Sequence, residues 1–231
     1  MAHIIGIVSQ KGGVGKSTIA RLLAREFADH GWSVKIADMD AYQGTSFYWT
    51  QRRAANHLLP EIRTEAFATV RAAVHDAEHF DLFIFDGAPH ATSTTREIAL
   101  ASDLVLLPSG LAVDDLQPQV LLAHELVKHG TVSSKIAFVL WRVGDSEAEM
   151  QDARQYIEQA GHRVLDGAVP DRTGYRRASD LGRAVTETAY ESLNSKADQV
   201  AQSIINAVTE TITQRRTHGQ ARKAPQTVTE R

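Results

Sequence analysis

KGGVGKST, residues 11–18, decides the fold of this chain. A glycine-rich loop that ends in Gly-Lys-Ser cradles phosphate oxygens with its backbone N–H groups, while the lysine reaches the β/γ-phosphates and the hydroxyl can hold Mg²⁺. The first glycine of the ordinary spacing would fall at position 10, which is Gln10, and an additional lysine begins the loop. The stretch is therefore a variant phosphate loop. Its predicted nucleotide-binding residues are Lys11, Gly12, Gly13, Val14, Gly15, Lys16, Ser17 and Thr18.

The segments on either side have the order that a phosphate loop requires. Residues 3–9 (HIIGIVS) read as a buried strand, and residues 18–30 show helical periodicity through Ile19, Leu22, Leu23 and Phe27. The free amides and the positive dipole end of such a helix face the phosphates. A glycine-rich turn without a ligand is the alternative, and the flanking strand and helix argue against it.

Composition favours one α/β domain. The chain has 231 residues, of which 43% are hydrophobic and 23% charged, and it has no cysteine. The lack of cysteine excludes disulfides, thiolate chemistry and cysteine-ligated metal clusters. The start MAHIIGIV lacks the pattern of a signal peptide, and no apolar run approaches the length of about 18 residues of a membrane span. We expect a cytoplasmic protein that does not cross a membrane.

Further along the chain, apolar runs alternate with helical patterns. Strands are expected at 34–37, 81–85, 103–107, 136–141 and 164–168, and helices at 41–56, 67–79, 93–101, 115–129, 146–160 and 187–213. The strands are continuously apolar, which is typical of a parallel sheet covered on both faces. The predicted fold is α/β: a mostly parallel, twisted sheet flanked by helices, formed as a single P-loop NTPase domain by residues 1–213.

The last segment, 214–231, is basic. The net charge of −3 divides into +4 on this segment and −7 on the rest of the chain. With almost no apolar residues it cannot compensate the entropy of ordering, so we expect a disordered tail. Either the tail is merely solvated or it attracts polyanions, and the sequence leaves both interpretations open.

Carboxylates follow two of the predicted strands. Asp38 and Asp40 come after 34–37, and Asp86 ends the strand of DLFIFDGAP, residues 81–89. Open α/β sheets bind ligands at the carboxyl ends of their strands. One of the first pair could orient an attacking water while the other supports Mg²⁺ or the loop lysine, although an Asp-x-Asp pair can also be a solvated loop or a helix cap. Asp86 could hold a Mg²⁺ water shell opposite Ser17. The predicted metal residues are Ser17, Asp38 and Asp86.

Residues 169–187 (VPDRTGYRRASDLGRAVTE) form an arginine-rich loop after the last predicted strand. Pro170 and Asp171 lie where a loop that binds the nucleotide base is expected. The arginines could contact DNA phosphates, pair with local acids or be solvated. They are Arg172, Arg176, Arg177 and Arg183.

These motifs resemble the ParA/MinD family of deviant Walker ATPases, and within it the short partition ATPases that lack an N-terminal DNA-binding domain. The resemblance spans residues 3 to about 210 and is carried by KGGVGKST, by DMD (38–40), by FDGAP (85–89) and by LVLLPSGLAVDDL (104–116). It implies that Lys11 reaches the phosphates of a partner subunit, that Lys16 and Ser17 serve their own subunit, and that Asp40 positions the hydrolytic water. The residues Ala41-Tyr42 and Gly87-Ala88 differ from those that are more common at these motif positions in the family.

The resemblance also implies a function. ATP and Mg²⁺ would hold a sandwich homodimer, which binds double-stranded DNA nonspecifically and associates with the nucleoid. The basic residues, including Arg215 and Arg216 of the tail, would then contact DNA, and a centromere-binding, ParB-like protein would stimulate slow hydrolysis. Relatives that position a non-DNA cargo, act in conjugation or work at a membrane like MinD remain alternatives, as does a module that uses ATP only as a structural ligand.

Overall fold

The structure, a computed structural model, describes residues 2–40, 43–90 and 92–221, with the backbone alone at 92 and 214–221. Its strands are β1 (His3–Ile7), β2 (Val34–Asp38), β3 (Arg63–Ala66), β4 (Leu82–Asp86), β5 (Leu104–Ser109), β6 (Ile136–Val143) and β7 (Arg163–Pro170). Its α-helices are α1 (Lys16–Asp29), α2 (Thr45–Ala55), α3 (Val70–Ala77), α4 (Thr92–Ala101), α5 (Val113–Lys128), α6 (Glu147–Gln159), α7 (Thr173–Asp180) and α8 (Glu191–Ala221). Two short 3₁₀ helices are η1 (Ser133–Lys135) and η2 (Val185–Glu187).

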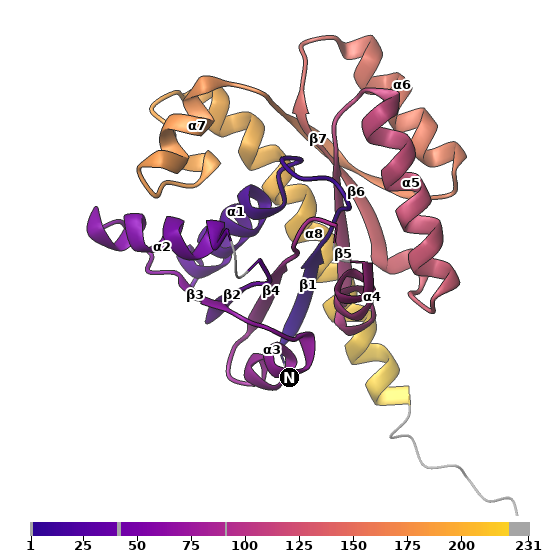
Figure 1. Ribbon diagram of the computed structural model, residues 1–231, viewed down its shortest axis with the longest axis horizontal. Helices are drawn as coiled ribbons and strands as arrows, with labels where there is room; N and C mark the ends of the chain where they lie inside the picture. Colours follow the sequence, from indigo (N-terminus) through magenta and orange to yellow (C-terminus); the bar gives the residue numbers. More distant parts are fainter. Residues whose placement is uncertain (1, 41–42, 91, 222–231) are drawn as a thin grey trace, which may run out of the picture.

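The strands of the described residues form one seven-stranded sheet in the order β3-β2-β4-β1-β5-β6-β7. Each neighbouring pair is parallel, which confirms the predicted fold class. Figure 1 shows α2 at the β2–β3 end of the sheet and α5 and α6 side by side near β5–β7.

Two hydrophobic cores cover the faces of the sheet. Alternate residues of a strand point to opposite faces, so Leu82 and Ile84 of β4 pack with α1 and α8, whereas Phe83 and Phe85 pack with α3, α4, α5 and α6. This double coverage is why the strands read as continuous apolar runs.

Two elements differ from the sequence prediction. Strand β3 (RTEA) was not expected, because a short and mostly exposed edge strand carries no apolar run. The arginine-rich segment is not a plain loop, since it folds into α7 and η2. Tyr175 and Ala178 of α7 are buried and supply the apolar side that stabilises this short helix.

Helix α8 packs on the body of the protein through an apolar stripe, as its sequence predicted. Val200, Ile204 and Val208 are buried in the core shared with α1. The helix continues to Ala221, so the prediction that order ends at 213 is wrong for residues 214–221. Adding residues to an existing helix costs little, and no proline interrupts this stretch. Residues 222–231 lie outside the described residues. Within the described chain, no helix has both the length and the apolar character to span a membrane.

Parallel strands bring several predicted site residues to one edge of the sheet. Asp38 and Asp86 are register partners on β2 and β4, and Ile7, which precedes the phosphate loop, pairs with Asp86 on β1. The carboxyl ends of β6 and β7 lie at the same edge. The topology thus concentrates the candidate chemistry beside the phosphate loop.

Candidate functional site

The phosphate loop leaves β1 and ends at the first turn of α1. Gly15, the N-cap of this helix, has φ 110°, and neither a side-chain cap nor an acidic residue satisfies the first turn. The first amides of a helix have no partner within it. They form an anion-binding site together with the positive end of the helix dipole.

Gly15 is required here for two reasons, and its replacement by Ala is expected to unfold or strongly destabilise the protein. A Cβ would lie 2.7 Å from Trp141 Nε1, and an L-residue at φ 110° is strained. Overpacking and backbone strain together should cost about 2–5 kcal/mol. Thermal melting without nucleotide measures the loss. Gly12→Ala is the matched control for stability, because its Cβ would meet nothing within 4 Å; equal melting of the two variants would contradict the assignment.

Lys16 is buried at the start of α1. Its ammonium donates to the backbone oxygen of Lys11 at 2.9 Å. Burial lowers the pKa of Lys16, while the charges of Asp86 and Asp40 act in the opposite direction. The arrangement places a desolvated cation where phosphate charge would compensate it.

Asp86 is buried, as is Ser46, and lies at the centre of a hydroxyl–carboxylate cluster. Ser17 Oγ donates to its Oδ1 at 3.1 Å and Ser46 Oγ to its Oδ2 at 2.6 Å. Thr45 Oγ1 lies 3.4 Å from Ser17 Oγ. Burial raises the pKa of Asp86 to about 6, helped by the nearby charge of Asp38. Hard oxygen ligands of this kind suit Mg²⁺, which retains several waters, so Ser17 and Asp86 fit the predicted metal.

Asp38 lies behind this cluster. Its carboxylate accepts backbone N–H groups from Ser46 at 3.0 Å, Phe47 at 3.2 Å and Asp40 at 3.1 Å. It is buried, and burial raises its pKa. Asp38 is not among the described residues that line the cavity. We therefore expect it to position the start of α2; its contact with a metal stays a prediction.

Asp40, by contrast, lines the cavity. Its Oδ1 accepts the backbone N–H of Gln43 at 3.1 Å, and its backbone oxygen accepts that of Gly44 at 2.8 Å. Its charge also acts on the Lys16 ammonium. Residues 41–42, at which this chain differs from the more common family sequence, lie outside the described residues. The carboxylate is thus held by the Gln43 N–H on the wall of the cavity that the phosphate loop also lines.

The phosphate loop forms one side of a cavity of about 580 Å³. This volume lies within the range of about 300 to 1,000 Å³ usual for small-molecule sites. Pro170, Asp171 and Tyr175 of α7 also line it; the contact of Pro170 and Asp171 with a nucleotide base stays a prediction. The cavity is therefore lined both by the phosphate loop and by residues of β7, of α7 and of the segment between them.

The predicted DNA-binding arginines fall into different environments. Arg172 pairs with Asp145, and Arg176 pairs with Asp171 at 2.6 Å; both line the cavity. Pairing with local acids, one of the alternatives considered above, therefore holds for these two. Arg177 is exposed, and the described part of the chain gives its side chain no ion pair or hydrogen bond.

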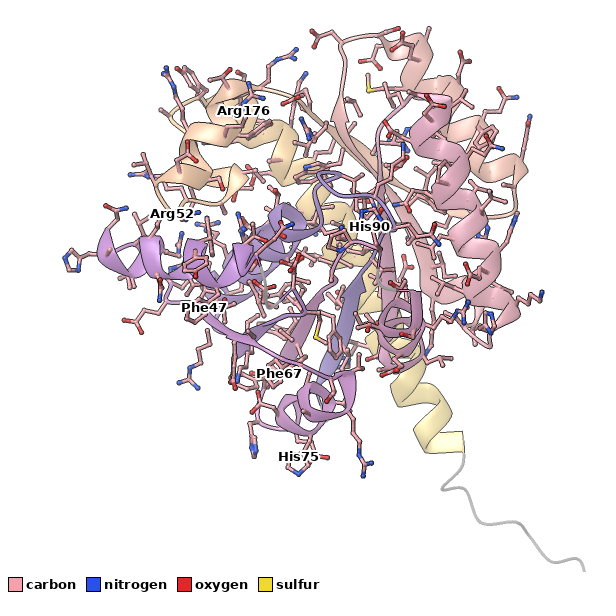
Figure 2. All side chains as sticks on the ribbon, viewed as in Figure 1. Phe47, Arg52, Phe67, His75, His90 and Arg176 are labelled. Carbon is pink, nitrogen blue, oxygen red and sulfur yellow. The ribbon has the colours of Figure 1, made fainter. Side chains whose placement is uncertain are left out.

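Arg183 is also exposed, with a 3.5 Å hydrogen bond to the Glu187 backbone oxygen. The side chains of Arg215 and Arg216 lie outside what the structure describes. Figure 2 shows Arg52 of α2 on the same side of the molecule as Arg176 of α7. The two helices adjoin there, since Asn56 Nδ2, just past α2, donates to the Leu181 backbone oxygen at 3.0 Å.

Lys11 points away from its own loop. Its ammonium contacts the backbone oxygen of Asp114 and pairs with Asp115 Oδ1 at 3.0 Å, both in the first turn of α5. The ion pair is about one-third exposed. A partly exposed pair of this kind is weak, on the order of 0–1 kcal/mol. Lys11 can therefore leave it for a stronger anionic partner.

Sequence reasoning missed Arg21, Thr45 and Ser46. Arg21 is buried, lines the cavity and donates through Nε to Ser46 Oγ at 3.3 Å and through Nη1 to Ser179 Oγ at 3.2 Å. Burial lowers its pKa to about 10, while Asp86 stabilises its charge. Arg21 follows Ser17 by one helical turn, and that spacing was the signal that could have found it. Thr45 and Ser46 were missed because α2 begins at Thr45, whereas the sequence predicted a helix that begins at residue 41.

Comparison with known proteins agrees with this geometry. Residues 5–185 match the family described as "CobQ/CobB/MinD/ParA nucleotide binding domain". The chain is 24% identical over 187 residues to "Maintenance of carboxysome distribution protein A" of Gloeobacter kilaueensis, covering 80% of this chain and 84% of that protein.

Solved structures share the fold. The cell division ATPase MinD of Pyrococcus furiosus superposes with a TM-score of 0.70 at 17% identity, covering 89% of this chain and 99% of MinD. The pNOB8 ParA bound to nonspecific DNA superposes with a TM-score of 0.58 at 15% identity, covering 89% of this chain and 99% of that chain. At these identities, the structural likenesses establish the fold alone.

Proposed function

This chain belongs to the CobQ/CobB/MinD/ParA nucleotide-binding family, and from that premise we propose that it is a ParA-like partition ATPase. In this proposal two copies sandwich two ATP molecules, the dimer binds DNA nonspecifically on the nucleoid, and hydrolysis releases it. A centromere-binding, ParB-like partner stimulates the hydrolysis.

The observation that carries the proposal is the convergence of Lys16, Ser17, Asp40 and Asp86 on one cavity. Lys16 and the α1 amides would neutralise phosphate charge, Ser17 and Asp86 would hold Mg²⁺, and Asp40 would orient water. Mg²⁺ would supply charge neutralisation at the phosphates. The buried Arg21 is already engaged by Ser46 and Ser179, so it is not free to stabilise the transition-state charge as an arginine finger does. This supports the need for a stimulating partner.

The position of Lys11 supports the dimer. The Lys11 ammonium is held by α5 through a partly exposed ion pair rather than by its own phosphate loop, so it is available to a second subunit. In a dimer, Lys11 of each subunit would exchange Asp115 for the partner's phosphates. Dimerisation would then depend on the γ-phosphate, so that hydrolysis acts as a timer.

Exposed arginines support a DNA-binding surface. Arg177 and Arg183 on and after α7 are the candidates, with Arg52 of the adjoining α2. One such surface binds DNA weakly, with a dissociation constant on the order of 10⁻⁴ to 10⁻⁶ M. Two surfaces on one dimer bind with avidity, which would make DNA binding depend on ATP. The solved DNA complex of pNOB8 ParA provides a precedent in the same fold.

A second function, positioning of a non-DNA cargo, is favoured by the carboxysome distribution protein to which this chain is 24% identical. In our proposal, both functions would rest on the same ATP-dependent dimer. They differ in the partner that stimulates hydrolysis: a protein that binds a specific DNA site in the first case, and a cargo adaptor in the second.

Lys11→Ala is expected to remain monomeric with ATP, whereas the wild-type protein dimerises, because the variant lacks the charge that each subunit offers to the other's phosphates. Light scattering on a sizing column with ATP, ADP and no nucleotide measures this. Lys128→Ala removes an exposed lysine at the end of α5 and should dimerise like the wild type. A Lys11→Ala variant that dimerises normally with ATP would contradict the sandwich.

A further inference from the structure

Strand β6 is irregular where it reaches the nucleotide cavity. Its register with β7 shifts between Trp141 and Val143, which marks Arg142 as a bulge. Arg142 has φ 58°, a left-handed conformation that costs a non-glycine residue free energy. Bulges beside active sites re-aim side chains, and strain of this kind persists where the surrounding contacts compensate it.

The bulge directs the Arg142 guanidinium to two parts of the site. Nη1 donates to the Gly13 backbone oxygen at 2.8 Å, and Nη2 donates to Asp171 Oδ2 at 3.1 Å. Asp171 is fixed in turn by Arg176, which donates to its other oxygen at 2.6 Å. Arg142 therefore links the phosphate loop to the segment after β7, across the cavity that all three residues line.

The contact with Gly13 acts on the peptide that joins Gly13 to Val14. A trans peptide is planar, so its C=O and N–H point in opposite directions. When a cation holds the Gly13 oxygen, the direction of the Val14 N–H is fixed as well. The charged donor also polarises the peptide, which makes that N–H a stronger donor to an anion.

The preceding residue, Trp141, buttresses the same loop. Its indole is buried and occupies the space beside Gly15, where a Cβ would overlap it. The end of β6 thus holds the loop at two glycines, one by packing and one by a charge-assisted hydrogen bond.

We propose that Arg142 is a positioning residue of the nucleotide site: through Gly13 it preorganises the phosphate loop, and Asp171 serves it as an anchor. The inference rests on the proposed binding of nucleotide. Because the loop grips phosphates that ATP and ADP share, Arg142 strengthens the binding of both nucleotides equally.

The test uses Arg142→Gly, which removes the guanidinium and accepts φ 58° without strain. Titration of a fluorescent ADP and a fluorescent ATP should show that the variant binds each about 10- to 100-fold more weakly, as expected for losing a hydrogen bond from a charged group. The nucleotide-free variant should melt at or above the wild-type temperature. A purely structural role for Arg142 would instead lower the melting temperature.

Two further variants sharpen the test. Arg142→Lys keeps one donor and should recover part of the affinity. Arg163→Met removes a half-exposed arginine at the opposite end of β7, where it pairs with Glu210, and should bind nucleotide like the wild type. Nucleotide affinity of Arg142→Gly within twofold of the wild type would overturn the proposal. So would a loss confined to ATP.

A double-mutant cycle tests the anchor. Asp171→Asn alone should weaken nucleotide binding, but it should add nothing in the Arg142→Gly background if Asp171 acts through Arg142. Additive losses would overturn the anchoring role. Wild-type protein that bound no nucleotide would overturn the proposed function itself, whereas normal wild-type binding with unaffected variants would overturn the role of Arg142 alone.

Discussion

Asp40→Ala is expected to hydrolyse ATP about 10²- to 10⁴-fold more slowly than the wild type while still binding it. The Asp40 carboxylate lines the cavity, and its charge acts on the Lys16 ammonium. In our account it orients the attacking water. Removing a negative charge beside the phosphates should leave nucleotide affinity unchanged or raise it. The variant should therefore accumulate as the ATP-bound dimer.

Phosphate release in single-turnover reactions and the mass of the complex with ATP measure the two effects separately. Asp152→Ala, which removes an exposed carboxylate from α6, is the matched control and should hydrolyse ATP at the wild-type rate. If Asp40→Ala hydrolysed ATP at the wild-type rate, a group other than Asp40 would have to activate the water. Loss of ATP binding would instead make Asp40 a nucleotide ligand.

Asp86→Asn is expected to stabilise the nucleotide-free protein and to abolish Mg²⁺-dependent hydrolysis. Burial and the charge of Asp38 raise the pKa of Asp86 from 3.8 to about 6. The folded protein therefore binds this proton more tightly than the unfolded chain does. The contribution of Asp86 to the free energy of unfolding falls as the pH rises from about 4 to 6, and it stays low at neutral pH.

Asparagine is uncharged at every pH, so it removes this penalty. Each pKa unit corresponds to 1.36 kcal/mol, which sets an upper limit of about 3 kcal/mol; weaker hydrogen bonds from Ser17 and Ser46 will reduce the gain. With Mg²⁺ and ATP the wild type should instead be more stable than Asp86→Asn, because ligand binding stabilises the wild type. The same change costs hydrolysis about 100-fold or more, since the metal loses a carboxylate.

Urea unfolding at pH 7.5 and pH 4.5, with and without Mg²⁺ and ATP, measures these differences. The gain of Asp86→Asn over the wild type should shrink at the lower pH, where the wild-type carboxyl is protonated. Asp166→Asn, on an exposed position of β7, is the matched control and should change neither stability nor hydrolysis. If Asp86→Asn were less stable than the wild type at pH 7.5 without ligand, burial of the charged Asp86 carboxylate would not be the penalty that we infer.

Much of the fold could be predicted because its signals are local. Strands covered on both faces, such as β4 and β5, appear as apolar runs, and the phosphate loop fixes the strand–loop–helix order around it. The edge strand β3 escaped because its sequence, RTEA, has neither an apolar run nor a buried face. Helix α7 escaped because a few buried side chains stabilise it through tertiary packing rather than periodicity.

The site was predictable where chemistry lies in a motif and unpredictable where it depends on pairing across the fold. Lys16, Ser17 and Asp86 come together as expected. The engagement of Asp38 by three backbone amides depends on where α2 begins, which the sequence left open. The link from Arg142 to Gly13 depends on a bulge in β6. The partners of Arg172 and Arg176, Asp145 and Asp171, depend on how β6, β7 and α7 meet.

The most direct test of the proposed switch is the binding of wild-type protein to random-sequence duplex DNA, followed by fluorescence anisotropy with ATP, ADP and no nucleotide over a range of salt concentrations. Our account predicts that the protein binds DNA with ATP but not with ADP or without nucleotide. This binding should weaken steeply as the salt concentration rises, because phosphate contacts release counterions. Equal affinity in all three nucleotide states, or no binding under conditions in which ATP forms the dimer, would contradict it.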